Sequence, residues 1–145
     1  MRKIYVINGP NLNMLGIREP DKYGDESYKS LMARLNTHAK ENGYTLVTYQ
    51  SNHEGDLVDK IQEAYYDKAA GIVINPGAYT HTSIALLDAI NATSIPTVEV
   101  HISDVSKREN FRQISYVRLA AKKTIMGHGL KGYFEAIEFL LSNNA

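Results

Sequence analysis

The chain has 145 residues, of which 43% are hydrophobic and 22% charged, so residues 1–145 are expected to form one domain with a buried core. Its 16 basic and 16 acidic residues cancel, which leaves no electrostatic footprint for nucleic acid or an anionic membrane surface. No apolar run is long enough to span a bilayer, and the absence of cysteine excludes disulfides and thiolate catalysis. The first residues carry no signal-peptide pattern, so we expect a cytoplasmic protein.

Short apolar runs alternate along the chain with segments that have a helical period. The runs predict five strands, at residues 3–8, 44–49, 71–75, 97–101 and 123–126. Asn42-Gly43 marks the end of the first helix, and Thr80 or Thr82 is expected to cap the third. Stripes with a period near 3.6 predict four helices, through Tyr28, Leu31, Met32, Leu35 and Ala39; Leu57, Val58, Ile61, Ala64 and Tyr65; Ile84, Leu87 and Ile90; and Tyr133, Phe134, Ile137, Leu140 and Leu141.

Strands that alternate with helices predict βαβ units, and therefore a parallel sheet that is covered on both faces. For a chain of this length we expect an α/β fold of flavodoxin-like type, a doubly wound five-stranded parallel sheet. Polar segments at 9–25, 76–82 and 102–112 follow strands one, three and four, which are neighbours in that strand order. Because ligands bind beyond the carboxyl ends of such strands, the three segments are expected to line one cleft.

Glu99 and His101 alternate with Val98 and Val100 in the fourth strand, so they should share one face of the sheet. A carboxylate beside an imidazole fixes the ring's tautomer and makes it a better proton carrier near neutral pH. The alternative is a polar strand end whose histidine faces water, but a carboxylate in an internal strand is costly unless it is paired. We therefore interpret the pair as part of a functional site.

The segment after this strand carries Arg108 and Arg112, which would share a face on a helical turn. For Arg108 alone, a solvated position is the expectation. Arg112 follows Phe111, which is expected to anchor the segment and hold its neighbour at the cleft mouth. Backbone N–H groups around Ile102 and Ser103 can also cradle an anionic oxygen. Together these groups predict a site for a small carboxylate or phosphate.

The segment NPGAYTHTS joins the third strand to the next helix through a tight Pro76-Gly77 turn. It places Asn75 at the strand tip and His81 near the helix start, where a capping or solvated histidine is as good an interpretation as a binding one. The sequence contains no P-loop, no dinucleotide-binding fingerprint, no nucleophile elbow and no HExxH metal motif. The remaining groups favour proton transfer.

The first loop, NGPNLNMLGIREPDKYG, is long and built largely from turn formers, yet it carries Arg18 and Tyr23. A free tyrosine has a pKa of about 10, so acting as a base near pH 7 requires roughly 4 kcal/mol of preference for the phenolate. One close, partly desolvated arginine can supply much of that. Gly16, Pro20 and Gly24 punctuate the segment, and we expect it to form a lid that carries the pair over a ligand.

Five stretches in this order and spacing closely resemble the type II 3-dehydroquinate dehydratases over nearly the whole chain: NGPNLNMLGIREPDKYG, SNHEG, INPGAYTHTS, VEVHIS and RENFR. The resemblance implies a flavodoxin-like hydro-lyase of the shikimate or quinate route. Such an enzyme removes water from 3-dehydroquinate by an anti elimination through an enolate, giving 3-dehydroshikimate. It uses no cofactor, no metal and no Schiff-base lysine. The resemblance also implies a homododecamer, a tetramer of trimers.

The same resemblance assigns roles to individual residues. Tyr23 is the base that removes the proton next to the ketone, and Arg18 keeps that tyrosine ionised. Asn11 positions a water that stabilises the enolate. His101 is the general acid that protonates the departing hydroxyl, and Glu99 orients it. The substrate-binding positions within the same chain are Asn75, His81, Ile102, Ser103 and Arg112.

Asp88 is a further substrate-binding position, which in the family reaches a neighbouring subunit's site. Here Leu87 stands before it, where many members carry an arginine. Lys122, Lys123 and His128 likewise replace smaller or apolar residues near the last strand. None of these departures removes a catalytic group, so we expect altered packing at a subunit interface and retained activity.

Three other functions stay open as alternatives. One is a related cofactor-free lyase or isomerase that acts on another cyclic hydroxy-keto acid. A second is a non-catalytic, receiver-type binding module, which would carry clustered acidic residues where this chain has NGPN. The third is a flavin-binding electron carrier, which would place a Ser/Thr-rich phosphate loop after the first strand and would be coloured when purified.

Overall fold

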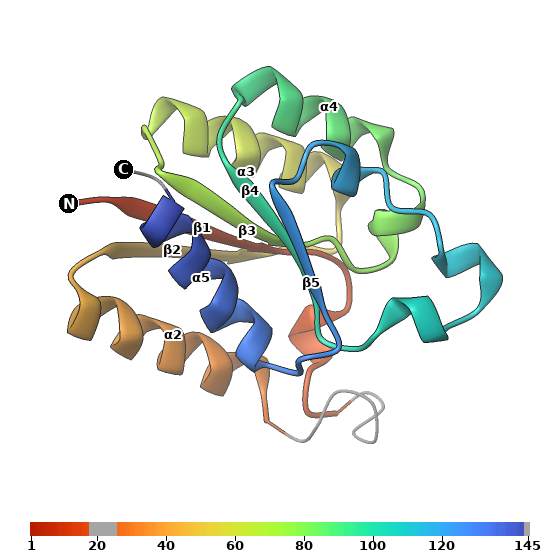
Figure 1. Ribbon diagram of the computed structural model, residues 1–145, viewed down its shortest axis with the longest axis horizontal. Coiled ribbons are helices and arrows are strands. Elements are labelled where there is room, and N and C mark those ends of the chain that lie inside the picture. Colours follow the sequence, from red (N-terminus) through yellow and green to blue (C-terminus); the bar gives the residue numbers. More distant parts are fainter. Residues whose placement is uncertain (18–25, 144–145) are drawn as a thin grey trace.

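Within residues 1–17 and 26–143, which the computed structural model describes, five strands form one parallel sheet (Figure 1). The spatial order β2-β1-β3-β4-β5 is the doubly wound order that the sequence predicts. It puts β1, β3 and β4 side by side, so the loops that follow them meet at one end of the sheet. The strand bounds are β1 (Lys3–Asn8), β2 (Thr45–Gln50), β3 (Gly71–Asn75), β4 (Thr97–His101) and β5 (Lys123–Met126).

The helices divide between the two faces of the sheet (Figure 1), as α2 (Tyr28–Asn42) and α5 (Lys131–Asn143) on one face, and α3 (Glu54–Tyr66) and α4 (Ile84–Thr93) on the other. Alternation along β4 decides which side chains meet which helices. Val98 and Val100 belong to the core beneath α2 and α5. Glu99 and His101 therefore face the side of α3 and α4, together, as predicted.

The predicted elements are confirmed with small shifts at their ends. β2 begins at Thr45, one residue later than expected, and Gly43 ends α2 as predicted. The expected cap of α4 is wrong. Ser83 caps this helix, because its Oγ accepts a hydrogen bond of 3.0 Å from the N–H of Leu86. The short 3-10 turn Gly77–His81 precedes the helix and uses Thr80, whose hydroxyl donates to the carbonyl of Gly77.

The buried stripes of two helices also differ from the prediction. In α4 the buried residues are Leu86, Ala89, Ile90 and Thr93, whereas Ile84 is exposed. Tyr65 of α3 is exposed as well, although it continues the apolar period. Leu57, Ile61 and Ala64 form the buried stripe of α3, and Tyr65 lies at the edge of that stripe, where its side chain is exposed.

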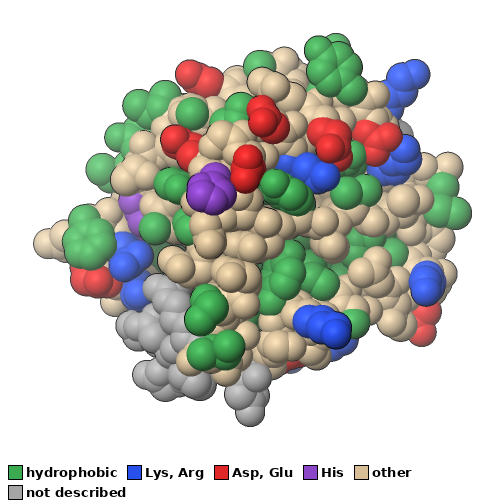
Figure 2. Space-filling view, turned by 180° about the vertical axis from the view of Figure 1, so that it is seen from behind, with side chains coloured by type: hydrophobic (Ala, Val, Ile, Leu, Met, Phe, Trp, Pro, Cys, Tyr) green, Lys and Arg blue, Asp and Glu red, His purple; other side chains and the backbone are tan. Residues whose placement is uncertain are grey.

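Charged side chains of both signs lie among one another on the face drawn in Figure 2, in keeping with the zero net charge. None of the described helices combines the length and the apolar character needed to cross a membrane.

The loops after β1 and β3 pack backbone against backbone at the carboxyl end of the sheet. A Cβ at Gly9 would lie 2.4 Å from the carbonyl oxygen of Pro76, and one at Gly77 would lie 2.9 Å from that of Pro10. The N–H of Gly9 also donates to the carbonyl of Asn75 at 2.8 Å. Glycine at these two positions lets the loops approach closely, which fixes the floor of the site described below.

We expect Gly9→Ala to lower the free energy of unfolding by about 3 kcal/mol, because its methyl group meets fixed backbone and not a side chain that can move aside. Urea titration followed by circular dichroism measures the change. Gly55→Ala is the matched control. Nothing lies within 4 Å of a Cβ there, and the residue is in α3, so stability should hold or rise by up to about 1 kcal/mol. Equal midpoints for Gly9→Ala and the wild type would show that the two loops are not locked together.

Candidate active site

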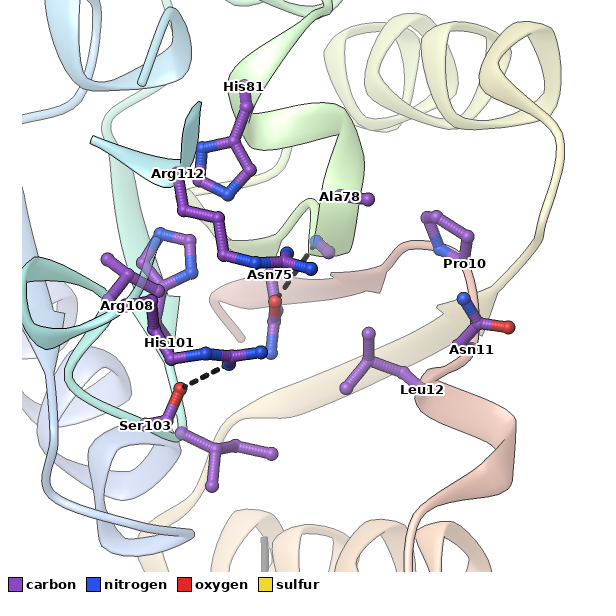
Figure 3. Close-up of a pocket in the computed structure, with 13 residues that line it drawn as sticks. Pro10, Asn11, Leu12, Asn75, Ala78, His81, His101, Ser103, Arg108 and Arg112 are labelled. Atoms are coloured by element: carbon purple, nitrogen blue, oxygen red, sulfur yellow. Dashed lines mark hydrogen bonds between the residues drawn. The ribbon is translucent and has the colours of Figure 1, made fainter. Parts of the chain in front are cut away.

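A cavity of about 230 Å³ opens where the loops after β1, β3 and β4 meet (Figure 3). The convergence of these three loops, predicted from the sequence, is confirmed. Seven of the predicted site residues line the cavity: Asn11, Asn75, His81, His101, Ile102, Ser103 and Arg112. The other lining residues are Pro10, Leu12, Gly77, Ala78, Val105 and Arg108.

Glu99 and His101 form a buried pair at the end of β4. Nε2 of His101 lies 2.5 Å from Oε2 of Glu99, and Glu99 has no exposed surface. Glu99 does not line the cavity but lies behind His101, which does. Because Nε2–H donates to the carboxylate, Nδ1 is the ring nitrogen left to exchange a proton with a ligand. The two side chains thus lie together on one face of the strand, as predicted, and their roles as acid and orienting carboxylate stay predictions.

Glu99 is ionised despite its burial. Burial by itself raises the pKa of Glu99, but the hydrogen bonds from His101 and Ser115 and the charge of Arg118 outweigh it and lower the pKa to about 2. The hydroxyl of Thr124 donates to the same carboxylate at 3.0 Å. At neutral pH, Glu99 therefore places a negative charge directly behind the imidazole.

Asn75 is held by a chain of buried hydrogen bonds. Its Nδ2 donates to the hydroxyl of Tyr133 at 3.0 Å, and that hydroxyl donates to Oδ1 of Asn8 at 2.7 Å. Its Oδ1 accepts a bond of 3.2 Å from the N–H of Gly77. Burial raises the pKa of Tyr133, so the phenol stays neutral and keeps donating. The amide of Asn75 thus has one defined orientation at the cavity wall.

His81 is positioned as a neutral hydrogen-bonding group. Its Nδ1 lies 2.7 Å from the carbonyl oxygen of Ile114, so Nδ1 carries the proton and donates. Burial lowers the pKa of His81. In the neutral ring, Nε2 is left as an acceptor, suited to a ligand hydroxyl. Of the two interpretations that the sequence left open, this geometry favours binding, because His81 lines the cavity and ends a 3-10 turn without capping α4.

Two arginines give the cavity its positive charge. The expectation that Arg108 faces solvent is wrong: its side chain is 12% exposed, and its guanidinium lies 3.4 Å from the hydroxyl of Ser103 (Figure 3). The segment forms two separate 3-10 turns, Val105–Lys107 and Asn110–Arg112, so the spacing of a continuous helix does not apply. Buried Val105 anchors the first turn, and Arg108 follows directly after that turn.

Phe111 does not anchor the segment, contrary to the prediction, because 65% of its surface is exposed. Instead, the guanidinium of Arg112 lies over its ring, 5.0 Å from the centroid. Glu109 accepts a bond of 3.1 Å from Nε of Arg112 and lies 3.5 Å from Nε of Arg108. Its own backbone N–H, together with both arginines, lowers the pKa of Glu109. The carboxylate thereby fixes the direction of both guanidinium groups.

Asn11 lines the cavity from the first loop in a left-handed conformation, with φ 70°. Asparagine tolerates this region better than most residues, and the Asn11 N–H is held by Oδ1 of Asn52 at 3.0 Å.

Besides Glu99, one predicted site residue in the described part of the chain does not line this cavity. Asp88 is exposed on α4 and does not line it. Arg18 and Tyr23 lie outside the described residues, as do residues 18–24 of the predicted lid, so their roles stay predictions.

The cavity suits an anionic, hydroxylated small molecule that exchanges a proton with His101. Among residues 1–17 and 26–143, no group of three or more His, Asp or Glu side chains is arranged to hold a metal ion. The chemistry available from the described residues is acid catalysis, hydrogen bonding through amides and an imidazole, and electrostatic stabilisation.

Comparison with known proteins agrees with the resemblance seen in the sequence. Residues 2–141 match the model of the family described as dehydroquinase class II. The chain is 52% identical over 142 residues to a 3-dehydroquinate dehydratase of Lachnoclostridium phytofermentans, covering 98% of each protein. It superimposes on a crystal structure of a type II dehydroquinase from Butyrivibrio crossotus with a TM-score of 0.95, at 53% identity and 97% coverage of both chains. It also matches a 3-dehydroquinate dehydratase of Caldicellulosiruptor bescii, with 50% identity over 137 residues and 94% of each protein.

Proposed function

The chain belongs to the dehydroquinase class II family, and we propose from this and from the cavity that it is a 3-dehydroquinate dehydratase of the shikimate pathway. The reaction removes a proton from the carbon next to the ketone, forms an enolate, and expels the neighbouring hydroxyl as water. The product, 3-dehydroshikimate, is a conjugated enone. Every bond change is a proton transfer or an elimination, so no oxidant, reductant or cofactor enters the balance.

The single observation that carries the proposal is the buried His101–Glu99 pair at the wall of a cationic cavity. Expulsion of the hydroxyl group from the enolate as water needs a proton donor at the leaving oxygen. His101 is that donor. Glu99 holds its Nε2–H and stabilises the imidazolium before transfer, so Nδ1 delivers the proton.

The remaining lining residues divide the substrate between them. Arg112 and the backbone at Ile102 and Ser103 bind the carboxylate, since they line the cavity and charge-assisted hydrogen bonds are the strong ones. The amide of Asn75 and Nε2 of neutral His81 bind ring hydroxyls. These side chains are held by other protein groups before a ligand arrives, which reduces the entropic cost of binding.

The first loop supplies the base in this proposal. Tyr23 removes the proton, Arg18 stabilises its phenolate, and Asn11 orients a water against the enolate oxygen. What supports the first two assignments is their match to the family's sequence motif. What supports Asn11 is also its position at the cavity wall.

We also propose a cytoplasmic dodecamer of four trimers, in which Asp88 reaches the site of a neighbouring subunit. Family membership supports this assembly, and in the single chain Asp88 is exposed and available for such a contact.

Turnover of 3-dehydroquinate, followed as the ultraviolet absorbance of the enone in buffer that contains a metal chelator, tests the proposed function. We expect saturable turnover that the chelator does not change. Folded protein that leaves saturating substrate unconverted would refute it.

A further inference from the structure

The Glu99 carboxylate accepts hydrogen bonds from an imidazole on one oxygen and from an arginine on the other. Oε2 takes the bond from His101 and one of 2.8 Å from the hydroxyl of Ser115. Oε1 takes the bond from Thr124 and one of 3.3 Å from Nε of Arg118. Among the described residues that contact this carboxylate, Arg118 is the only one that carries a permanent charge.

The fold holds Arg118 in this place. It lies in the 3-10 turn Val117–Leu119, whose first residue, Val117, is fully buried in the core beneath α3 and α4. The backbone N–H of Arg118 donates to Oγ of Ser115 at 3.2 Å, and that hydroxyl donates onward to Glu99. Arg118 therefore touches the carboxylate directly through its guanidinium and indirectly through Ser115.

Arg118 approaches Glu99 from outside the cavity. It does not line the cavity, and 41% of its side chain is exposed, whereas Glu99 is completely buried. A substitution at Arg118 thus changes the charge behind His101 without changing a surface that contacts the substrate.

We propose that Arg118 is a positioning residue for proton delivery: by sharing the charge of Glu99, it limits how tightly that carboxylate holds the proton on His101. The inference rests on the proposed role of His101 as general acid. An ionised carboxylate with no second cation would stabilise the imidazolium strongly, and a strongly stabilised acid gives up its proton slowly. Arg118 competes for the same charge and keeps His101 a usable acid, while its positive charge keeps Glu99 ionised.

Five other polar or charged side chains face Glu99 or His101. Ser115 and Thr124 contact Glu99 as neutral hydroxyls. On the cavity side of His101, the titratable and charged lining residues are His81, Arg108 and Arg112 (Figure 3). These five residues stay unchanged in the variants below, so a change in the titration of His101 reports the charge at position 118.

The test uses Arg118→Gln, which keeps an N–H donor and removes the charge. The His101 ring is titrated by NMR in protein without substrate, with its signal assigned by its absence in a His101→Ala variant. We expect the midpoint to move to higher pH by about half a unit, a modest shift because Arg118 is partly exposed. In turnover assays the alkaline limb of the kcat profile should move by the same amount, kcat should fall several-fold, and KM should hold.

Two matched variants complete the design. Arg118→Lys keeps the charge and should return the midpoint most of the way to its wild-type position. Lys122→Gln removes an equal charge from an exposed residue of the same segment, with no contact to Glu99, and should leave the midpoint in place. An Arg118→Gln midpoint that stays in place or moves to lower pH overturns the proposal. Because the titration needs no turnover, it reports on Arg118 even if 3-dehydroquinate is not the substrate.

Discussion

His101→Ala should lower turnover of 3-dehydroquinate by about 10³- to 10⁴-fold, yet still exchange the proton next to the ketone with solvent. The loss corresponds to removal of a positioned general acid. Exchange survives because proton abstraction and enolate formation precede the step that His101 serves. The exchange is measured by NMR of the substrate in D₂O, and turnover by the absorbance of the enone.

The variant is expected to fold. Glu99 loses one donor but keeps Ser115, Thr124 and Arg118, so the carboxylate is not left without hydrogen bonds. His128→Ala serves as the control, because His128 is an exposed residue that pairs with Glu135 away from the cavity. Its turnover should equal that of the wild type. If exchange disappears together with turnover in His101→Ala, the histidine takes part in proton abstraction and the assignment is wrong.

Tyr23→Phe should abolish both turnover and exchange, by about 10⁴-fold or more, while an unreactive cyclic hydroxy-carboxylate still binds. The substitution removes one oxygen, and that oxygen is the base in the proposed mechanism. Without a base no enolate forms, so exchange is lost here and kept in His101→Ala. The contrast between the two variants separates the two half-reactions.

Binding of the analogue, measured by calorimetry, distinguishes catalysis from recognition. An affinity that falls in parallel with the rate would identify Tyr23 as a binding residue. Tyr66→Phe removes the same hydroxyl from an exposed tyrosine of α3 and should change neither quantity.

Sequence patterns predicted the architecture well because each strand and helix is specified mainly by its own residues. Short apolar runs predicted the bounds of β1, β3, β4 and β5 to the residue. The strand order agrees with the general rules for how βαβ units connect. Errors fell where tertiary context decides. Tyr65 lies at the edge of the buried stripe of α3 and is exposed, and Ser83 caps α4 because a 3-10 turn precedes the helix.

The site was also predicted where its residues follow local patterns, and missed where distant contacts decide. His101 and Glu99 were identified from strand alternation alone, and three loops were identified from their length and polarity. Arg108 was misplaced, since a pair of 3-10 turns has no sequence period that points one arginine inward. Tyr133 lies 58 residues from Asn75 and 125 residues from Asn8, so no local sequence pattern indicates the hydrogen bonds that orient Asn75. Arg118 escaped notice for the same reason, because its partner Glu99 lies 19 residues away in another element.

The most direct measurement is elimination from 3-dehydroquinate that carries deuterium in place of the hydrogen anti to the departing hydroxyl, in metal-free buffer. In the proposed mechanism, a base from the first loop and an acid from the end of β4 act from opposite sides of the ring, so they remove the anti hydrogen and the hydroxyl. We predict that wild-type protein forms the enone and that the product has lost the deuterium. Product that retains the label, or folded protein that forms no enone, would contradict a cofactor-free anti elimination at this cavity.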